Sequence, residues 1–237
     1  MQVTRDLLKA FPLLKSLPDE ALDELARQSS ASRYARRAIV LNAGANQEGI
    51  CFLFEGRLQG VDFTVDGREV GLYFVEPADF CGELTLFDQG EQPEFVIALT
   101  ASVVVSIPPD ALRDVMLSNP QVMAEVGIRL AARVRQLTRQ RSLLGLPNIA
   151  QRVCYQLWML VPESHRKSEQ GVDGASEIRN PPTHMELAIM LNVSRETVTR
   201  VFQSLQNRQI VKRDGPSRLQ LTDLGALKRF AEGDEEL

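Results

Sequence analysis

The residues best suited to chemistry form one polar helix face near the C-terminus. Advancing about 100° per residue from Arg195 gathers polar side chains between about 0° and about 140°. They are Arg195, Glu196, Thr199, Arg200 and Gln203. Arginine can pair with both O6 and N7 of guanine, and glutamate can accept a hydrogen bond from cytosine N4. The pattern therefore predicts a helix that contacts base edges in a DNA groove.

The segment before this helix completes a helix-turn-helix pattern. We expect residues 184–191 to form the first helix, in which the small Ala188 allows a second helix to cross closely. Asn192 tolerates the left-handed conformation of a tight turn, and Ser194 is a favourable N-cap for the second helix. At the start of the first helix, His184 is expected to lie near DNA phosphate. The apolar face of the second helix, predicted to be buried, comprises Val198, Val201, Phe202 and Leu205.

A predicted β-hairpin over residues 210–221 turns at Asp214-Gly215 and carries cations near its tip. Such a wing suits phosphate contacts, which position a protein on DNA. The stretch 195–230 holds eight basic and three acidic residues, a local charge of +5, whereas the whole chain carries −4. The net charge excludes a bulk polycation, and the local charge favours a confined DNA-binding surface. The predicted DNA-binding residues are Ser194, Arg195, Glu196, Thr199, Arg200, Gln203, Lys212 and Arg213.

The polar helix face is also compatible with other functional classes. A solvated helix with ordinary surface charges would present a similar polar face. Alternatively, the chain is a ligand-sensing interaction protein whose C-terminal module binds protein. An enzyme is not favoured, because the chain has no P-loop, GxSxG or HExxH pattern, and we expect no catalytic residue. Its three cysteines are far apart, which predicts neither a disulfide framework nor a zinc site, and no metal is expected.

The chain before the predicted helix-turn-helix must position it. This part begins with a helical region, which is followed by a β-rich region. Residues 7–26 have helical spacing broken by prolines. Between about residues 33 and 107, turn residues recur about every 8–12 residues, which is typical of a barrel or sandwich. The clearest hairpin turns at Asp66-Gly67, which we expect to be a two-residue turn. Pro108-Pro109 ends the last strand.

A long helix is predicted over residues 121–144. Its apolar stripe is narrow, which favours contact with an identical partner helix over packing on its own β domain. Residues 145–148 predict a hinge, residues 149–160 an amphipathic helix, and residues 162–176 a polar surface loop. The stripe comprises Met123, Val126, Leu130, Val134, Leu137 and Leu144.

The order of a β-rich domain, a long helix and a winged helix-turn-helix resembles the CRP/FNR superfamily of bacterial transcription regulators. Residues 194–200, Ser-Arg-Glu-Thr-Val-Thr-Arg, closely match the recognition-helix motif of that family. Several motifs of the first half are similar to its cyclic-nucleotide-binding-type roll. They are Gly44, Phe52, Gly56-Arg57, Asp66-Gly67-Arg68 and residues 79–84.

The resemblance implies an α+β fold. It comprises an N-terminal cyclic-nucleotide-binding-type β-roll (a double-stranded β-helix or jelly roll), a long dimerisation helix and a C-terminal winged helix-turn-helix. The implied domains are a sensory roll at residues 1–120, a dimerisation helix at 121–145 and a DNA-binding domain at 146–237. A homodimer would bind double-stranded DNA at a palindrome of TGTGA-like half-sites through Arg195, Glu196 and Arg200. RNA polymerase is a further implied partner, and activation and repression are both compatible with the pattern.

The effector implied by the resemblance is not cyclic AMP bound in the usual mode. Members that bind cyclic AMP follow their Gly-Glu-Leu motif with an Arg-Ser or Arg-Thr pair, but no Lys or Arg occurs here between Arg68 and Arg113. Glu91 and Glu94 would repel a phosphate at that place. Another nucleotide, such as a cyclic dinucleotide, is the alternative that some members of the superfamily sense. The retained motif residues, which we expect at the effector, are Gly82, Glu83 and Leu84.

Two arginines of the long helix, Arg129 and Arg133, are further candidates for contacting an anionic effector, with a solvated helix face as the alternative. An iron–sulfur cluster of the FNR type is not expected, because no cysteine precedes Cys51. Both histidines lie after the predicted hinge, so no histidine of the roll can hold a haem. Cys81 is expected to be an apolar filler, with redox tuning or haem ligation as alternatives. No cofactor is predicted.

The sequence also indicates where the protein resides. Its first residues have no apolar stretch typical of a secretory signal. No run approaches the ~18 apolar residues that a membrane helix requires. We therefore expect a cytoplasmic protein with no membrane partner.

Overall fold

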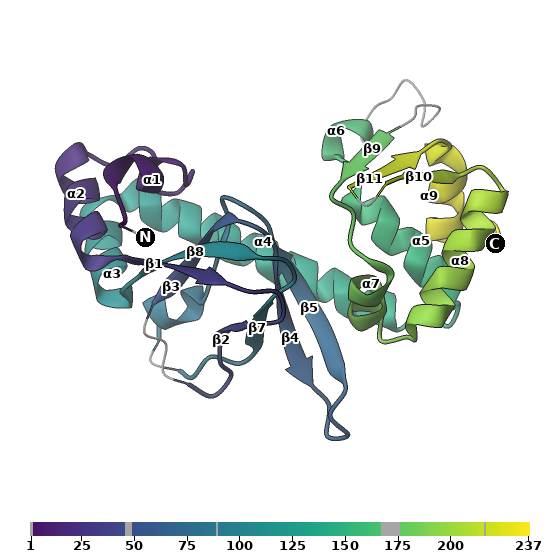
Figure 1. Cartoon of the computed structure of the whole chain (residues 1–237), viewed down its shortest axis with the longest axis horizontal. Coiled ribbons are helices and arrows are strands. Elements are labelled where there is room, and N and C mark those ends of the chain that lie inside the picture. Colours follow the sequence, from purple (N-terminus) through teal and green to yellow (C-terminus); the bar gives the residue numbers. More distant parts are fainter. Residues whose placement is uncertain (1, 46–48, 89, 167–175, 216) are drawn as a thin grey trace. The chain divides into compact units, whose positions relative to one another are not determined.

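The computed structural model describes residues 2–45, 49–88, 90–166, 176–215 and 217–237 (Figure 1). Internal contacts divide the chain into two units, Met1–Leu137 and Thr138–Leu237. The boundary falls within the long helix α4 (Pro120–Leu144), so each unit contains part of that helix.

The first unit is built on two antiparallel sheets of four strands each. One sheet has the order β1-β8-β3-β6 and the other the order β2-β7-β4-β5. Most neighbours in the sheets are not consecutive in the chain, which is the arrangement of a jelly roll and confirms the predicted β-roll. The strands are β1 (Ser30–Tyr34), β2 (Ile39–Leu41), β3 (Ile50–Glu55), β4 (Leu58–Phe63), β5 (Glu69–Val75), β6 (Phe80–Cys81), β7 (Phe95–Ala98) and β8 (Ser102–Ile107).

Helices close one side of the roll and complete its core. In Figure 1, α1 (Arg5–Lys9), α2 (Asp19–Gln28) and α3 (Pro109–Ser118) lie beside the sheet that contains β1 and β8. The ring of Phe52 on β3 is fully buried, with its centroid 5.1 Å from that of Phe11 and 5.2 Å from that of Phe80. Helix α3 begins at Pro109, directly after β8, as the proline pair predicts.

The β4–β5 hairpin has a longer turn than expected. The backbone N–H of Thr64 donates to the Arg68 carbonyl at 3.0 Å, and that of Gly67 donates to the Thr64 carbonyl at 2.8 Å. Three residues, Val65 to Gly67, therefore connect the paired positions, and the prediction of a two-residue turn was wrong. Gly67 supplies the single positive φ, 79°, that this kind of turn requires.

The second unit packs helices around a three-stranded antiparallel sheet of order β10-β11-β9. Helix α5 (Ile149–Leu160) has the predicted bounds, and α7 (His184–Leu191) and α8 (Arg195–Asn207) form the predicted helix pair. The predicted hairpin consists of β10 (Val211–Asp214) and β11 (Arg218–Leu221). Trp158 belongs to the buried core of this unit.

Three elements of the second unit were missed. The predicted loop over residues 162–176 contains the short helix α6 (Glu163–Arg166), and its residues 167–175 lie outside the described part of the chain. Strand β9 (Ser176–Arg179) adds to β11. Helix α9 (Leu224–Glu232) follows an Asp223 N-cap and ends at Gly233, which are ordinary helix boundary signals.

The roll covers part of the predicted partner-facing stripe of α4. Val126 is fully buried in the core of the roll, and Leu130 packs against that core. Met123 and Val134, in contrast, are 40% and 63% exposed. The prediction that the whole stripe faces a partner helix was therefore wrong, because the roll covers Val126 and Leu130. Ile128, which is 60% exposed, belongs to the uncovered side and was missed.

No helix in the described part of the chain is long and apolar enough to span a bilayer.

Asn192 offers a test of the turn between α7 and α8, because its φ of 51° places it in the left-handed region. Asn192→Gly should change the free energy of unfolding by only a few tenths of a kcal/mol, whereas Asn192→Val should lower it by about 1–2 kcal/mol. Urea unfolding followed by the fluorescence of Trp158, the single tryptophan, measures this unit selectively. Equal midpoints for the two variants would contradict the assigned turn.

Candidate DNA-binding surface and effector site

Helix α7 is bounded by capping groups at both ends. At its start, the Glu186 N–H donates to Thr183 Oγ1 at 3.3 Å, and the Thr183 N–H donates to Glu186 Oε2 at 3.0 Å, which forms a capping box. At its end, Asn192 adopts the left-handed conformation, and the Val193 N–H donates to the Ala188 carbonyl at 3.0 Å. The turn predicted from Ala188 and Asn192 is confirmed.

Helix α8 starts where the sequence predicts. Ser194 is its N-cap, and its Oγ accepts a hydrogen bond from the Thr197 N–H at 3.1 Å. The predicted apolar face is buried in the core of the second unit. On the opposite face, Arg195, Glu196, Arg200 and Gln203 are exposed and Thr199 is half-buried. The structure thus brings the polar residues of the predicted base-reading set to one solvent-facing surface.

The charges on this surface suit hydrogen bonding to bases. The backbone N–H at the helix start and the Ser194 hydroxyl lower the pKa of Glu196, and Arg195 and Arg200 add to this effect. Glu196 is therefore an ionised acceptor at neutral pH. Arg200 Nη2 donates to Thr197 Oγ1 at 3.3 Å. Within the described residues, no hydrogen bond or ion pair engages the Arg195 guanidinium, so all its donors face solvent.

The wing places its two predicted phosphate contacts on opposite sides. Side chains alternate along a strand, so Lys212 and Arg213 of β10 lie on different faces of the sheet. Lys212 is exposed, whereas Arg213 is half-buried and acts electrostatically on His184 of α7. Arg213 therefore lies toward the helix pair. Arg218 of β11 lies opposite Asp214 in the register of the two strands. It is exposed and was not among the predicted contacts.

In the roll, the motif Gly82-Glu83-Leu84 turns sharply after β6. Gly82 has a positive φ of 83° and precedes the 3₁₀ helix η1 (Glu83–Leu86). The side chain of Glu83 is buried, whereas Leu84 is 42% exposed. Glu83 and Leu84 are therefore not brought to one site, and only Glu83 points into the roll.

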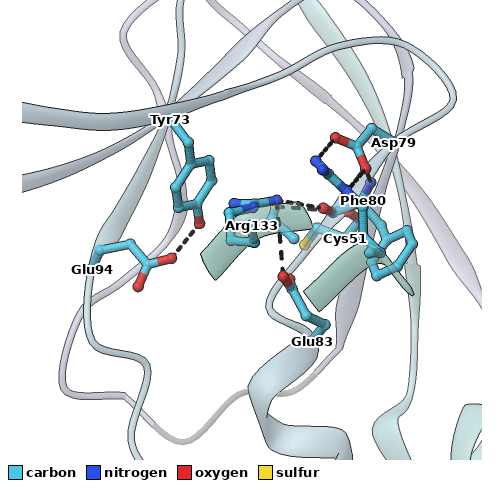
Figure 2. A network of polar contacts seen from close by, with 9 residues as sticks. Cys51, Tyr73, Asp79, Phe80, Glu83, Glu94 and Arg133 are labelled. Atoms are coloured by element: carbon cyan, nitrogen blue, oxygen red, sulfur yellow. Dashed lines mark hydrogen bonds and ion pairs between the residues drawn. The ribbon is translucent and has the colours of Figure 1, made fainter. Parts of the chain in front are cut away.

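Arg129 and Arg133 of α4 both contact the roll, so the alternative of a solvated helix face does not hold for them. Arg129 binds Asp79 with two nitrogens, and its Nε lies 2.6 Å from Oδ1. Arg133 is 5% exposed, and its Nη2 lies 3.4 Å from the Phe80 carbonyl and 3.9 Å from Glu83 Oε1. Figure 2 shows its guanidinium near both groups. The long helix thus places a buried cation beside the Gly82-Glu83-Leu84 motif.

Tyr73 and Glu94 complete this cluster. The guanidinium carbon of Arg133 lies 3.5 Å from the centroid of the Tyr73 ring. Tyr73 Oη donates a hydrogen bond to Glu94 (Figure 2). Burial raises the pKa of Glu94, and the nearby Glu83 carboxylate raises it further. No sequence pattern identified Tyr73 as a member of this cluster, because its position depends on the pairing of β4 with β5.

Cys81 lies directly opposite Cys51 in the β3–β6 pair, and both thiols are free and buried. Hydrogen bonding with Cys51, in which the protonated Cys81 thiol is the donor, raises the pKa of Cys81 well above its usual value, and burial adds to the rise. The thiol therefore stays protonated, which fits a small apolar filler better than a reactive redox group.

Comparisons with known proteins cover both units. A family model described as a cyclic nucleotide-binding domain matches residues 31–119, and one described as a Crp-like helix-turn-helix domain matches residues 151–230. The CRP-like cAMP-activated global transcriptional regulator of Mycobacterium tuberculosis H37Rv is 26% identical over 226 residues, covering 95% of this chain and 99% of the relative. The Cyclic AMP receptor protein of Thermus thermophilus is 25% identical with the same coverage, 95% and 99%.

Solved structures share the fold. FixK2 from Bradyrhizobium japonicum gives a TM-score of 0.71 at 18% identity, covering 85% of this chain and 96% of that chain. The c-di-GMP responsive global regulator CLP from Xanthomonas campestris gives a TM-score of 0.65 at 21% identity, covering 86% and 99%. With a cyclic nucleotide-binding domain and a Crp-like helix-turn-helix domain that together match more than half of its length, this chain belongs to the CRP/FNR family of transcription regulators.

Proposed function

We propose that this protein is a homodimeric regulator that binds a TGTGA-like palindrome. Its effector is an anionic nucleotide, and it is not cyclic AMP bound in the family's usual mode. The observation that carries the DNA assignment is the exposed polar face of α8, with an unengaged Arg195 guanidinium beside an ionised Glu196. Such a pair matches the donor and acceptor pattern of a G·C base pair in the major groove. We propose RNA polymerase as a further partner of the protein.

The dimer is supported by the uncovered face of α4. The large apolar residues Val134 and Ile128 are 63% and 60% exposed. A partner helix packed on this face would remove them from water. Gly127 precedes Ile128 in the chain and shares a helix face with Val134, seven residues later, and a Cβ added to it would meet nothing within 4 Å. Glycine within a helix costs about 0.5–1 kcal/mol relative to alanine. A small residue here lets a second copy of α4 approach closely, which gives that cost a physical reason.

The effector assignment rests on the incomplete contacts of Arg133. A guanidinium has five N–H donors. Arg133 makes one hydrogen bond of 3.4 Å, to the Phe80 carbonyl, and one ion pair of 3.9 Å, to Glu83. Its buried Nε has no hydrogen-bond partner among the described residues. A ligand phosphate could form the short bidentate contacts that these groups do not provide.

Selection of DNA from a random pool by the full-length protein tests the DNA assignment. A palindrome of TGTGA-like half-sites should be enriched, because two recognition helices of a symmetric dimer contact half-sites about one helical turn apart. Arg195→Ala should lose about 1–3 kcal/mol of discrimination at the contacted guanine, measured by fluorescence anisotropy on matched and substituted half-sites.

Lys212→Ala is the matched control for this substitution. It should weaken binding to all sequences about equally and lower the slope of log affinity against log salt by about one. Enrichment of no palindrome, or unchanged guanine discrimination in Arg195→Ala, would contradict the proposal.

Ile128→Asp tests the dimer. A carboxylate in a close helix–helix contact is desolvated without a partner, so the variant should shift the protein toward the monomer by tenfold or more in dissociation constant, an effect of about 1.4 kcal/mol or more. Sedimentation equilibrium measures this shift. Leu117→Asp places the same charge at an apolar residue of α3 that is 68% exposed and should leave the dimer intact. A monomeric wild type, or equal effects of both variants, would refute the α4 contact.

Calorimetric unfolding with a panel of cyclic mono- and dinucleotides tests the effector site. A bound nucleotide at 100 times its Kd should stabilise the roll by about 2.7 kcal/mol. Arg133→Met should abolish this stabilisation. Arg129→Met should keep it, since both contacting nitrogens of Arg129 are already occupied by Asp79. If no nucleotide stabilises the wild type, or if Arg133→Met responds as the wild type does, the effector site is wrongly placed.

A further inference from the structure

His184 joins the two helices of the proposed DNA-binding surface. It is the first residue of α7, and its Nδ1 lies 2.9 Å from Oγ1 of Thr199 on α8. Its ring packs on that of Phe202, with 4.4 Å between the centroids. Thr199 lies on the same helix face as Arg195. The imidazole is therefore fixed beside the residues that are proposed to contact DNA.

The neighbouring hydrogen bonds determine which ring nitrogen can take up a proton. The Thr199 hydroxyl donates its hydrogen to the Arg195 carbonyl at 2.9 Å. Its oxygen is then the acceptor for His184, so Nδ1 carries the hydrogen of the neutral ring. The lone pair lies on Nε2, which has no hydrogen-bond partner among the described residues. Protonation at Nε2 leaves the contact between His184 and Thr199 intact.

The free protein disfavours this protonation. Burial lowers the pKa of His184, and the positive charges of Arg213 on β10 and Arg195 on α8 lower it further. The acidic residue of the same turn, Glu186, has its Oε2 engaged by the Thr183 N–H. A DNA phosphate at this surface would reverse the balance, because it neutralises the field of both arginines and favours a charged imidazole.

We propose that DNA binding by this protein is linked to the uptake of one proton per subunit at Nε2 of His184, which then donates a hydrogen bond to a backbone phosphate. This inference rests on the proposed DNA-binding function. By linkage, a group that binds a proton more tightly in the complex makes the complex tighter as the pH falls. Histidine is the side chain whose ordinary titration range lies near neutral pH.

Fluorescence anisotropy with the selected operator, at constant ionic strength, tests this linkage on the full-length protein. Between about pH 8 and about pH 5.5, the wild type should bind roughly three- to tenfold more tightly per subunit at the acidic end. The slope should not exceed about one proton per subunit. His184→Gln should bind with an affinity that is independent of pH over this range.

The second of the two histidines provides the matched control. His165→Gln, in α6, should keep the full slope of the wild type. A flat profile in the wild type, or an unchanged slope in His184→Gln, would overturn the linkage while DNA binding itself persists. Absence of specific binding at every pH would instead refute the proposed DNA-binding function.

A measurement on the unmutated protein covers the case in which His184→Gln does not fold. NMR titration of the two histidine rings, with and without operator, gives each pKa directly. The pKa of His184 should rise on DNA binding, and that of His165 should stay in place. Equal His184 values in the free and bound protein would exclude the proposed proton uptake.

Discussion

The arrangement of the first unit depends on a buried cation that α4 inserts into the roll. Arg133 lies among Glu83, Tyr73 and the Phe80 carbonyl, with the bidentate pair of Arg129 and Asp79 next to it. Removing one partner of a buried ion pair costs about 3–5 kcal/mol, because the other charge is left without compensation. A rotation of α4 about its axis would separate both pairs at once. These contacts therefore fix which side of α4 the roll covers, and hence which side carries Ile128 and Val134 into solvent.

A sequence predicts which residues share a helix face more reliably than it predicts which other element covers that face. The periodicity of α8 sufficed to identify its buried and polar sides, because its whole apolar side packs into one core, that of the second unit. Capping residues Ser194 and Asn192 fixed the ends of both helices for the same local reason. On α4, the equivalent counting placed Val126 and Val134 in one stripe. Contacts with the roll, formed by strands far away in the chain, divided them.

The same limit applies to the proposed effector site. Gly82 and Glu83 were identified from a motif of adjacent residues, but the cation facing them is 50 residues away from Glu83 along the chain and on another element. Tyr73 enters the cluster only through the register of β5 against β4, in which it lies opposite Gly60. A side chain at Gly60 would collide with the Tyr73 ring, since an added Cβ would lie 2.6 Å from it. No local pattern in the sequence predicts which residues of β4 and β5 lie opposite each other.

On the proposed function, the cation that binds the ligand belongs to α4 and not to the roll, which affects how the ligand would act. A ligand shifts a conformational equilibrium only to the extent that it binds two states with different affinity. On the proposed function, an anion held by Arg133 would replace its contacts of 3.4 Å to the Phe80 carbonyl and 3.9 Å to Glu83. Those are the contacts that hold α4 at its present rotation. On that proposal the same guanidinium would bind the ligand and orient the helix, so the difference in affinity would arise within this one side chain and would not require a series of coupled residues.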